Sequence, residues 1–253
     1  MRTLLAIALL LGLGLGAALA QPRSDSAREQ RWAEQILPSL VIGEPVWLAT
    51  PAGGKFLALW APVAKARGLV LLAHGPGLHP DHGITGELRM HLTDRGYATL
   101  SLQMPVLPAE QEAGDGYREL MPDAAARIAA GMRFLQEKGP GRIAIVSHAM
   151  GSGMTHEYLR RNPGAPVSAW AALSYYGVFD AVKGVQFPVL DLFGENDYRG
   201  IRGPARDRAR LLAALPGSRQ LALPEGGRFL AGGEKAVLRE VGEFLDTVLA
   251  RGR

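Results

Sequence analysis

Residues 142–154 read RIAIVSHAMGSGM, and the rest of the fold can be worked out from them. The stretch opens with an aliphatic run over 143–146, which is typical of a β-strand with both faces buried. Small residues follow over 149–153 and favour a tight turn that leads into a helix. We therefore expect a strand over 142–147 and a helix over 151–161, joined by a sharp turn.

The turn has the spacing of the G-x-S-x-G motif. In that motif the central side chain stands on a strained strand-to-helix turn above the sheet, where a substrate can reach it. In this chain the five positions hold Ser147, His148, Ala149, Met150 and Gly151. The position of an attacking hydroxyl is thus taken by the methyl group of Ala149. The sequence predicts the turn of a hydrolytic enzyme without the atom that would attack.

Strands and helices alternate on both sides of this turn. Two short apolar runs separated by Pro51-Ala52-Gly53-Gly54 predict an N-terminal antiparallel hairpin, and the later connections are too short to hold a cap domain. The alternation predicts an α/β fold with a mainly parallel sheet and helices on both faces. The expected strands are 46–50, 56–60, 69–73, 97–102, 142–147, 169–175, 189–193 and 219–223, and the expected helices are 84–95, 123–138, 151–161, 204–215 and 234–250.

The N-terminus has the layout of a secretory signal peptide over residues 1–20, with Arg2 at its start, an apolar run over 4–16 and small residues before the cleavage point. We expect residues 21–40 to form a linker and a short helix, and 41–253 to form a single domain. The protein is therefore predicted to be periplasmic or secreted. It contains no cysteine, so its stability must come from its core and not from disulfide bonds.

The charge of the chain argues against some classes of partner. The formal net charge at pH 7 is +4, and no basic run is interleaved with aromatic residues. Nucleic acid is therefore not expected as a partner. Once the signal peptide is cleaved, no membrane span is expected either.

Four stretches in the order strand, loop and turn carry a resemblance to a known family. They are HGPGLHPD at 74–81, SLQMPVL at 101–107, VSHAMGSGM at 146–154 and FGENDY at 193–198. With them the chain resembles the α/β-hydrolase superfamily, and within it an uncharacterised group of exported proteobacterial proteins. The resemblance implies the α/β-hydrolase fold. It also implies a triad in chain order, with a nucleophile at the elbow, an acid after a later strand and a histidine near the last strand.

The triad that the resemblance implies is degenerate in this chain. Asp197 stands at the position of the acid, and Ala149 stands at that of the nucleophile. Where relatives look like GADHFF, this chain reads EGGRFL over 225–230, so Arg228 replaces the general base. A guanidinium with a pKa above ~12 cannot accept a proton at working pH. Pro76 stands where an oxyanion-hole donor is often found, and proline has no N–H.

Our main interpretation is that the former active-site mouth is a non-catalytic binding site for a small anionic ligand or for a partner. Arg228 and the Met150 amide would hold a carboxylate or phosphate, and Gly75, Gly77 and His148 would line the site. The alternative is that Arg228 pairs with Asp197 and closes the site as a structural ion pair. The sequence leaves these two readings open.

Two enzymatic alternatives also remain open. A carboxylesterase could use Ser147 or Ser152 as a displaced nucleophile, provided that a base lies within hydrogen-bond reach. A metal-dependent hydrolase could use histidines and a carboxylate near the turn. The candidate ligands for that metal are His74, His79, Asp81, His82 and His148. In the preferred interpretation the protein needs neither a metal nor a cofactor.

Overall fold

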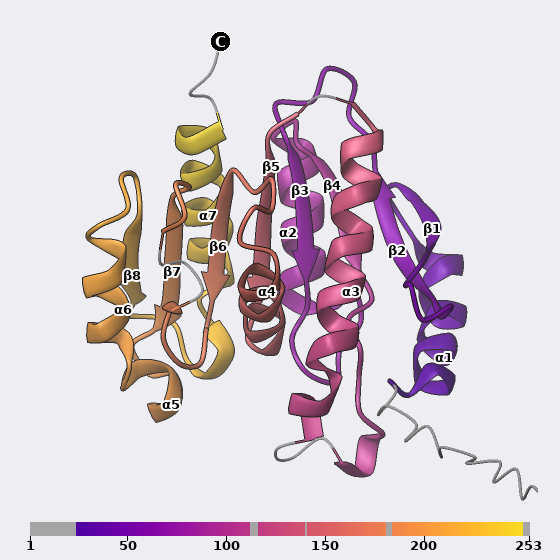
Figure 1. Cartoon of the computed structure of the whole chain (residues 1–253), viewed down its shortest axis with the longest axis horizontal. Helices are drawn as coiled ribbons and strands as arrows, with labels where there is room; N and C mark the ends of the chain where they lie inside the picture. The colour runs from indigo at the N-terminus through magenta and orange to yellow at the C-terminus, as the bar shows by residue number, and fades with distance from the viewer. Residues whose placement is uncertain (1–23, 112–115, 140, 181–183, 250–253) are drawn as a thin grey trace, which may run out of the picture.

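The computed structural model describes residues 24–111, 116–139, 141–180 and 184–249. They form one eight-stranded sheet in the order β1-β2-β4-β3-β5-β6-β7-β8 (Figure 1). β2 runs antiparallel to β1 and β4, and the other neighbours are parallel. This confirms the predicted mainly parallel sheet with an N-terminal hairpin. The strands are β1 Glu44–Ala49, β2 Lys55–Ala61, β3 Leu69–Ala73, β4 Ala98–Leu102, β5 Ile143–His148, β6 Ala169–Leu173, β7 Val189–Gly194 and β8 Arg219–Leu223.

Helices cover both faces of the sheet because the side chains of each central strand are apolar on both sides. On β3, Leu69 and Leu71 pack into one core cluster together with α3 and α4, whereas Val70 and Leu72 pack into another with α2 and α7. The helices are α1 Ser26–Ile36, α2 Gly83–Asp94, α3 Gly116–Glu137, α4 Met150–Arg161, α5 Arg199–Arg202, α6 Ala205–Leu212 and α7 Glu234–Leu249. Short 3₁₀ turns lie at Leu37–Ser39, Ala109–Gln111 and Arg228–Leu230, the last labelled η4.

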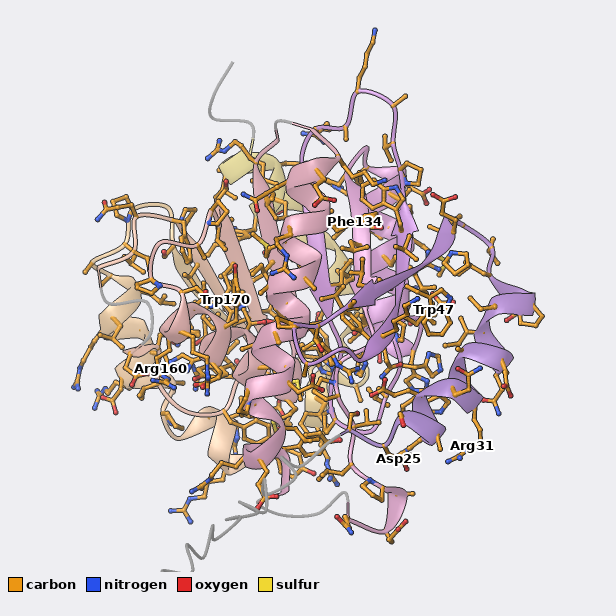
Figure 2. The ribbon with its side chains drawn as sticks, turned by 45° about the vertical axis from the view of Figure 1, so that its right-hand side comes forward. Asp25, Arg31, Trp47, Phe134, Arg160 and Trp170 are labelled. Carbon is orange, nitrogen blue, oxygen red and sulfur yellow. The ribbon has the colours of Figure 1, made fainter. Side chains whose placement is uncertain are left out.

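The labelled side chains in Figure 2 illustrate the difference between core and edge. Trp170 on β6 is fully buried, whereas Trp47 on the edge strand β1 is 46% exposed. Among the described residues, no helix is both long and apolar enough to cross a membrane. The predicted signal peptide, residues 1–20, lies outside the described residues and stays a prediction.

Two predicted helix boundaries are wrong. α3 begins at Gly116 and not at 123, with Pro122 inside it. The buried Tyr117 and Leu120 bring the turns before Pro122 onto the core, and this packing outweighs the backbone hydrogen bond that proline cannot donate. The predicted helix 204–215 is instead α6, preceded by the separate turn α5.

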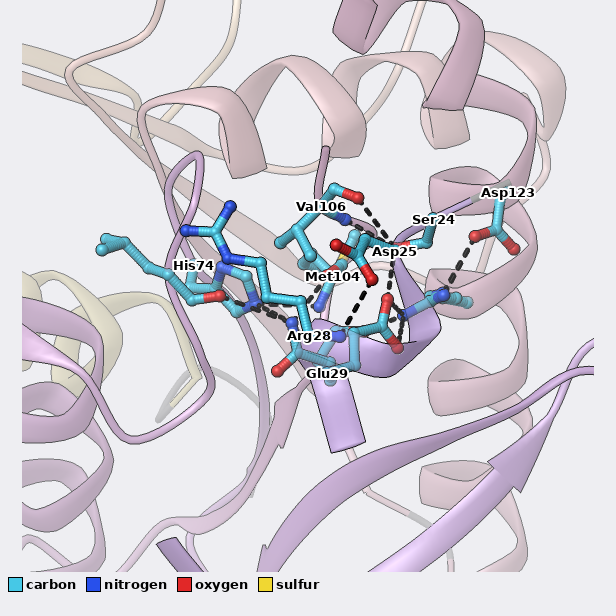
Figure 3. A network of polar contacts seen from close by, with 11 residues as sticks. Ser24, Asp25, Arg28, Glu29, His74, Met104, Val106 and Asp123 are labelled. Atoms are coloured by element: carbon cyan, nitrogen blue, oxygen red, sulfur yellow. Dashed lines mark hydrogen bonds and ion pairs between the residues drawn. The ribbon is translucent and has the colours of Figure 1, made fainter. Parts of the chain in front are cut away.

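The N-terminal helix α1 is part of the domain. Asp25 caps it by accepting a hydrogen bond from the Arg28 amide at 2.9 Å. The chain before it is fastened to the loop after β4, since Asp25 donates its amide to the Val106 carbonyl at 2.9 Å and Val106 donates its amide to Ser24 Oγ at 2.7 Å (Figure 3). Glu29 of α1 forms a buried ion pair of 3.0 Å with Arg127 of α3. These contacts hold α1 against α3 and the loop after β4.

Candidate functional site

The turn after β5 has the predicted elbow geometry. β5 ends at His148, Ala149 takes φ 50° and ψ −114°, and α4 begins at Met150. A positive φ in a residue other than glycine is strained, as expected at the apex of a nucleophile elbow. Gly151 allows this close packing, because a Cβ there would lie 2.4 Å from the Ala73 carbonyl oxygen. The elbow therefore stands at the carboxyl edge of the sheet, between β3 and β6.

The loop after β3 reaches the elbow but leaves little room above it. A Cβ on Gly75 would lie 3.2 Å from His148 Nδ1 and 3.6 Å from the Ala149 Cβ. Ala149 itself has no exposed surface. The N–H of Gly77, a residue predicted to line the site, donates to the Tyr117 hydroxyl at 2.8 Å. The nucleophile position is thus enclosed and carries no reactive atom.

Asp197 lies beyond the end of β7, where the acid was predicted, and it is 2% exposed. One oxygen, Oδ1, accepts hydrogen bonds from the Tyr198 and Phe229 amides, both at 2.9 Å. The other, Oδ2, accepts from the Ser174 hydroxyl at 2.6 Å. Through these hydrogen bonds the carboxylate holds the loop after β7 and η4 together and so stabilises the local structure.

Arg228 does not pair with this carboxylate, so the predicted alternative of an Arg228–Asp197 ion pair is wrong. The guanidinium lies over the Tyr198 ring, 4.3 Å from its centroid, and 5.7 Å from the centroid of Phe229. Across the described ranges, no carboxylate lies within 4.0 Å of it. The reason is that Asp197 is already satisfied by backbone amides and Ser174. Arg228 keeps its charge available at the edge of the site.

His148 is held by the same loop. Its Nε2 donates to the Phe229 carbonyl at 3.2 Å, and the two rings meet edge-on with centroids 6.0 Å apart. Within the described part of the chain, Nδ1 is buried and has no partner. Burial lowers the pKa of His148 to about 4, so the imidazole is neutral at pH 7. Phe229 takes φ 55° and ψ 35° to present its carbonyl.

Aromatic side chains that the sequence analysis did not single out surround Arg228. Tyr176, Tyr198 and Phe229 pack on one another with ring centroids 5.0 to 6.4 Å apart. We call these residues together with Arg228 the arginine–aromatic cluster. Tyr176 is 38% exposed, and partial burial raises its pKa above the ordinary value. The signal that could have found the cluster was the placement of Tyr176 and Tyr198 just after two neighbouring parallel strands.

The two serines proposed as displaced nucleophiles are engaged in structural hydrogen bonds. Ser147 is 1% exposed and accepts from the Trp170 indole at 2.8 Å, and its hydroxyl lies 3.1 Å from that of Ser152. Ser152 is fully buried and donates to the Ser147 carbonyl at 2.8 Å. Among the described contacts, neither hydroxyl has a histidine or carboxylate partner that could act as a base.

The histidines proposed as metal ligands do not converge. His74 donates Nδ1–H to the Gly75 carbonyl at 2.8 Å and accepts the Met104 amide on Nε2 at 2.9 Å. Burial lowers its pKa to about 3, which keeps it neutral. Asp81 is bound by Arg89 at 2.6 Å. Three or more metal-ligating side chains are nowhere grouped for one ion in the described ranges, and this holds for His79, His82 and His148 as well.

Comparison with known proteins bears on the fold of this chain and not on the residues of the site. A family model described as "Protein of unknown function (DUF3530)" matches residues 17–115, which is less than half of the chain. No curated protein matches the chain.

Three of the solved structures with a similar fold are hydrolases or hydrolase-like. A dienelactone hydrolase from Anabaena variabilis is 18% identical with a TM-score of 0.65, covering 81% of this chain and 98% of that one. An esterase from Pyrococcus furiosus is 14% identical with a TM-score of 0.63, covering 81% and 92%. A protein from Xanthomonas campestris, described as an α/β serine hydrolase without lid, is 12% identical with a TM-score of 0.65, covering 84% and 98%. By sheet order, elbow geometry and these likenesses, the chain has the fold of the α/β-hydrolase superfamily, and the described residues form no cap domain.

Proposed function

We propose that this chain is an exported pseudo-hydrolase that binds an anionic group at the arginine–aromatic cluster and does not catalyse ester hydrolysis. The observation that carries the proposal is the environment of Arg228. Its guanidinium lies on the Tyr198 ring at 4.3 Å and is not neutralised by the neighbouring Asp197. An arginine stacked on an aromatic ring is pre-organised to bind a carboxylate or phosphate through paired hydrogen bonds.

The chemistry of the elbow supports the non-catalytic part of the proposal. Ala149 has no nucleophilic atom. His148 donates a hydrogen bond to the Phe229 carbonyl, so this histidine does not act as a base for position 149. A hydrolase site that loses its nucleophile keeps a rate enhancement of at most ~10³ to 10⁴ over the uncatalysed reaction. This remaining enhancement depends on an oxyanion hole. Pro76 removes one expected donor of that hole. The Met150 amide stays as a candidate second contact for the anion.

The first experiment measures binding of phenyl phosphate and benzoate by calorimetry. Both probes carry one anionic group and one aromatic ring, which suits a cluster built from Arg228, Tyr176 and Tyr198. We expect Arg228→Ala to weaken binding by roughly tenfold or more and Arg228→Lys to weaken it less, because lysine keeps the charge but loses the planar fork.

The matched control is Arg239→Ala, which removes an exposed arginine from α7. This variant should bind both probes like the parent. Equal affinity of the parent and Arg228→Ala would overturn the proposed site. Turnover of p-nitrophenyl acetate by the parent protein would overturn the non-catalytic assignment, whatever the binding data show.

A further inference from the structure

A cleft lies at the end of the sheet opposite to the elbow. It has a volume of about 450 Å³ and opens between the end of β2, the start of β3 and β4 and the end of α3. The elbow stands at the carboxyl end of β3, whereas this cleft is lined by Leu69 at its amino end. Five residues of extended strand separate the two by about 13 Å or more. The cleft is therefore separate from the arginine–aromatic cluster.

The lining of this cleft is part apolar and part polar, and its charged side chains are positive. Pro62, Val63 and Ala66 form apolar wall, and Lys65 and Lys138 are its charged residues, with no aspartate or glutamate in the lining. Within the described part of the chain, neither lysine has a carboxylate within 4.0 Å. Two ammonium groups thus border a partly apolar cleft, and no carboxylate of the described residues neutralises them.

Trp60 supplies a further hydrogen-bond donor to the cleft. It is 5% exposed and meets Phe134 of α3 edge-on with centroids 5.5 Å apart, and Figure 2 labels Phe134 at this end of α3. Lys138 Nζ lies 4.5 Å from the Phe134 centroid and 5.9 Å from that of Trp60. The indole N–H of Trp60 has no acceptor among the described residues, and it keeps some accessible surface although the rest of the side chain is buried. A ligand oxygen in the cleft would satisfy it.

From this donor set we propose that the cleft binds a medium-chain carboxylate. Its hydrocarbon chain would lie against Pro62, Val63 and Ala66, and its carboxylate would accept hydrogen bonds from Lys65, Lys138 and the Trp60 indole. A volume of 450 Å³ lies within the range of small-molecule sites. The charge pattern selects the ligand class, because a neutral chain leaves both ammonium groups unpaired and a cationic chain is repelled.

The test is a titration of the ¹⁵N-labelled protein with sodium octanoate, followed through the tryptophan indole resonances. Trp60→Phe assigns the Trp60 signal among the four tryptophans. We expect that signal to shift saturably, and the K65A/K138A double variant to raise the dissociation constant for octanoate roughly tenfold or more. Both lysines are exposed, so the double variant should keep the parent's fold, which its unchanged backbone spectrum would report.

Three further measurements keep this proposal separable from the one above. Lys235→Ala removes an exposed lysine from α7 and should leave octanoate binding unchanged. Arg228→Ala should also leave it unchanged, and loss of octanoate binding in that variant would move the ligand to the arginine–aromatic cluster and overturn this proposal. An unshifted Trp60 signal at millimolar octanoate would also overturn this proposal. Equally tight binding of 1-octanol, which has the same hydrocarbon chain without the charge, would overturn it as well.

Discussion

At the scale of single residues, the chemistry of the elbow is decided by two side chains. Ala149 lacks a nucleophilic atom, and Arg228 cannot take a proton. The backbone nevertheless has the geometry of a nucleophile elbow, since Ala149 takes a strained φ of 50°, and Asp197 is held by three hydrogen bonds. The proposed loss of reactive atoms at this site can be tested by introducing a serine and a histidine at these two positions.

Restoring both residues at once is the prediction that belongs to this scale. We expect the A149S/R228H double variant to hydrolyse p-nitrophenyl acetate at least tenfold faster than the parent, because it regains a nucleophile at position 149 and a side chain at position 228 that can accept a proton. The rate should stay far below that of intact triads, since Pro76 leaves the oxyanion hole short of one donor. Release of p-nitrophenolate measures it.

The single variant A149S is the control, and it should be as silent as the parent because no base is present. If A149S alone were as fast as the double variant, another residue would be acting as the base. The assignment of position 228 as the former base would then be wrong.

At the scale of elements, α1 is bound to the domain by a buried ion pair and by backbone hydrogen bonds. Arg127 of α3 reaches Glu29 of α1 at 3.0 Å and also Asp123 at 3.1 Å. Desolvation raises the pKa of Glu29, and the neighbouring Arg127 opposes this rise. Such a pair adds little net stability when complete, but leaving one member buried without its partner is costly. α1 should therefore be sensitive to the loss of a single carboxylate.

The prediction at this scale compares two glutamates of the same helix. Glu29→Ala should lower the free energy of unfolding by roughly 3 kcal/mol, because Arg127 stays buried with only Asp123 as a charged partner. Glu34→Ala removes an exposed glutamate and should change it by less than about 0.5 kcal/mol. Urea unfolding of the parent and both variants measures the difference. Equal losses in the two variants would show that the Glu29–Arg127 pair does not hold α1.

At the scale of the whole molecule, two neutral histidines are buried near the carboxyl edge of the sheet. Burial lowers the pKa of His74 to about 3 and that of His148 to about 4, from an ordinary value of 6.5. In the unfolded chain both titrate near 6.5, so between that pH and the lowered values the unfolded state binds more protons than the folded one. The stability that depends on these two neutral histidines is therefore fully present above pH 6.5, and it is lost as the pH falls toward their lowered pKa values.

The corresponding prediction is a loss of about 1.4 kcal/mol per pH unit for each of these histidines between pH 6 and 4.5. His148→Gln keeps a donor for the Phe229 carbonyl but does not titrate, so its stability should fall with pH less steeply than the parent's by about that slope. Urea unfolding at several pH values measures both. Parallel pH profiles would mean that His148 is not buried as a neutral ring.

Part of this protein follows from local sequence alone. The strand, turn and helix around Ala149, the N-terminal hairpin and the parallel order of later strands were all predicted from apolar runs and small-residue turns, and the structure has them. The identities of Ala149 and Arg228 are also visible in the sequence. These features are local because hydrophobic period and backbone conformation depend on neighbours along the chain.

The contacts between distant segments were decided only by the tertiary structure. Arg228 lies on Tyr198 and not on Asp197, and the Gly77 amide in the loop after β3 donates to the Tyr117 hydroxyl of α3. Each of these contacts depends on which possible partner lies close to the polar group after the helices and strands have packed. The linear sequence does not specify this choice of partner. The sequence by itself therefore determined the scaffold and the missing chemistry, whereas packing across the sheet decided which charges remain free to bind a ligand.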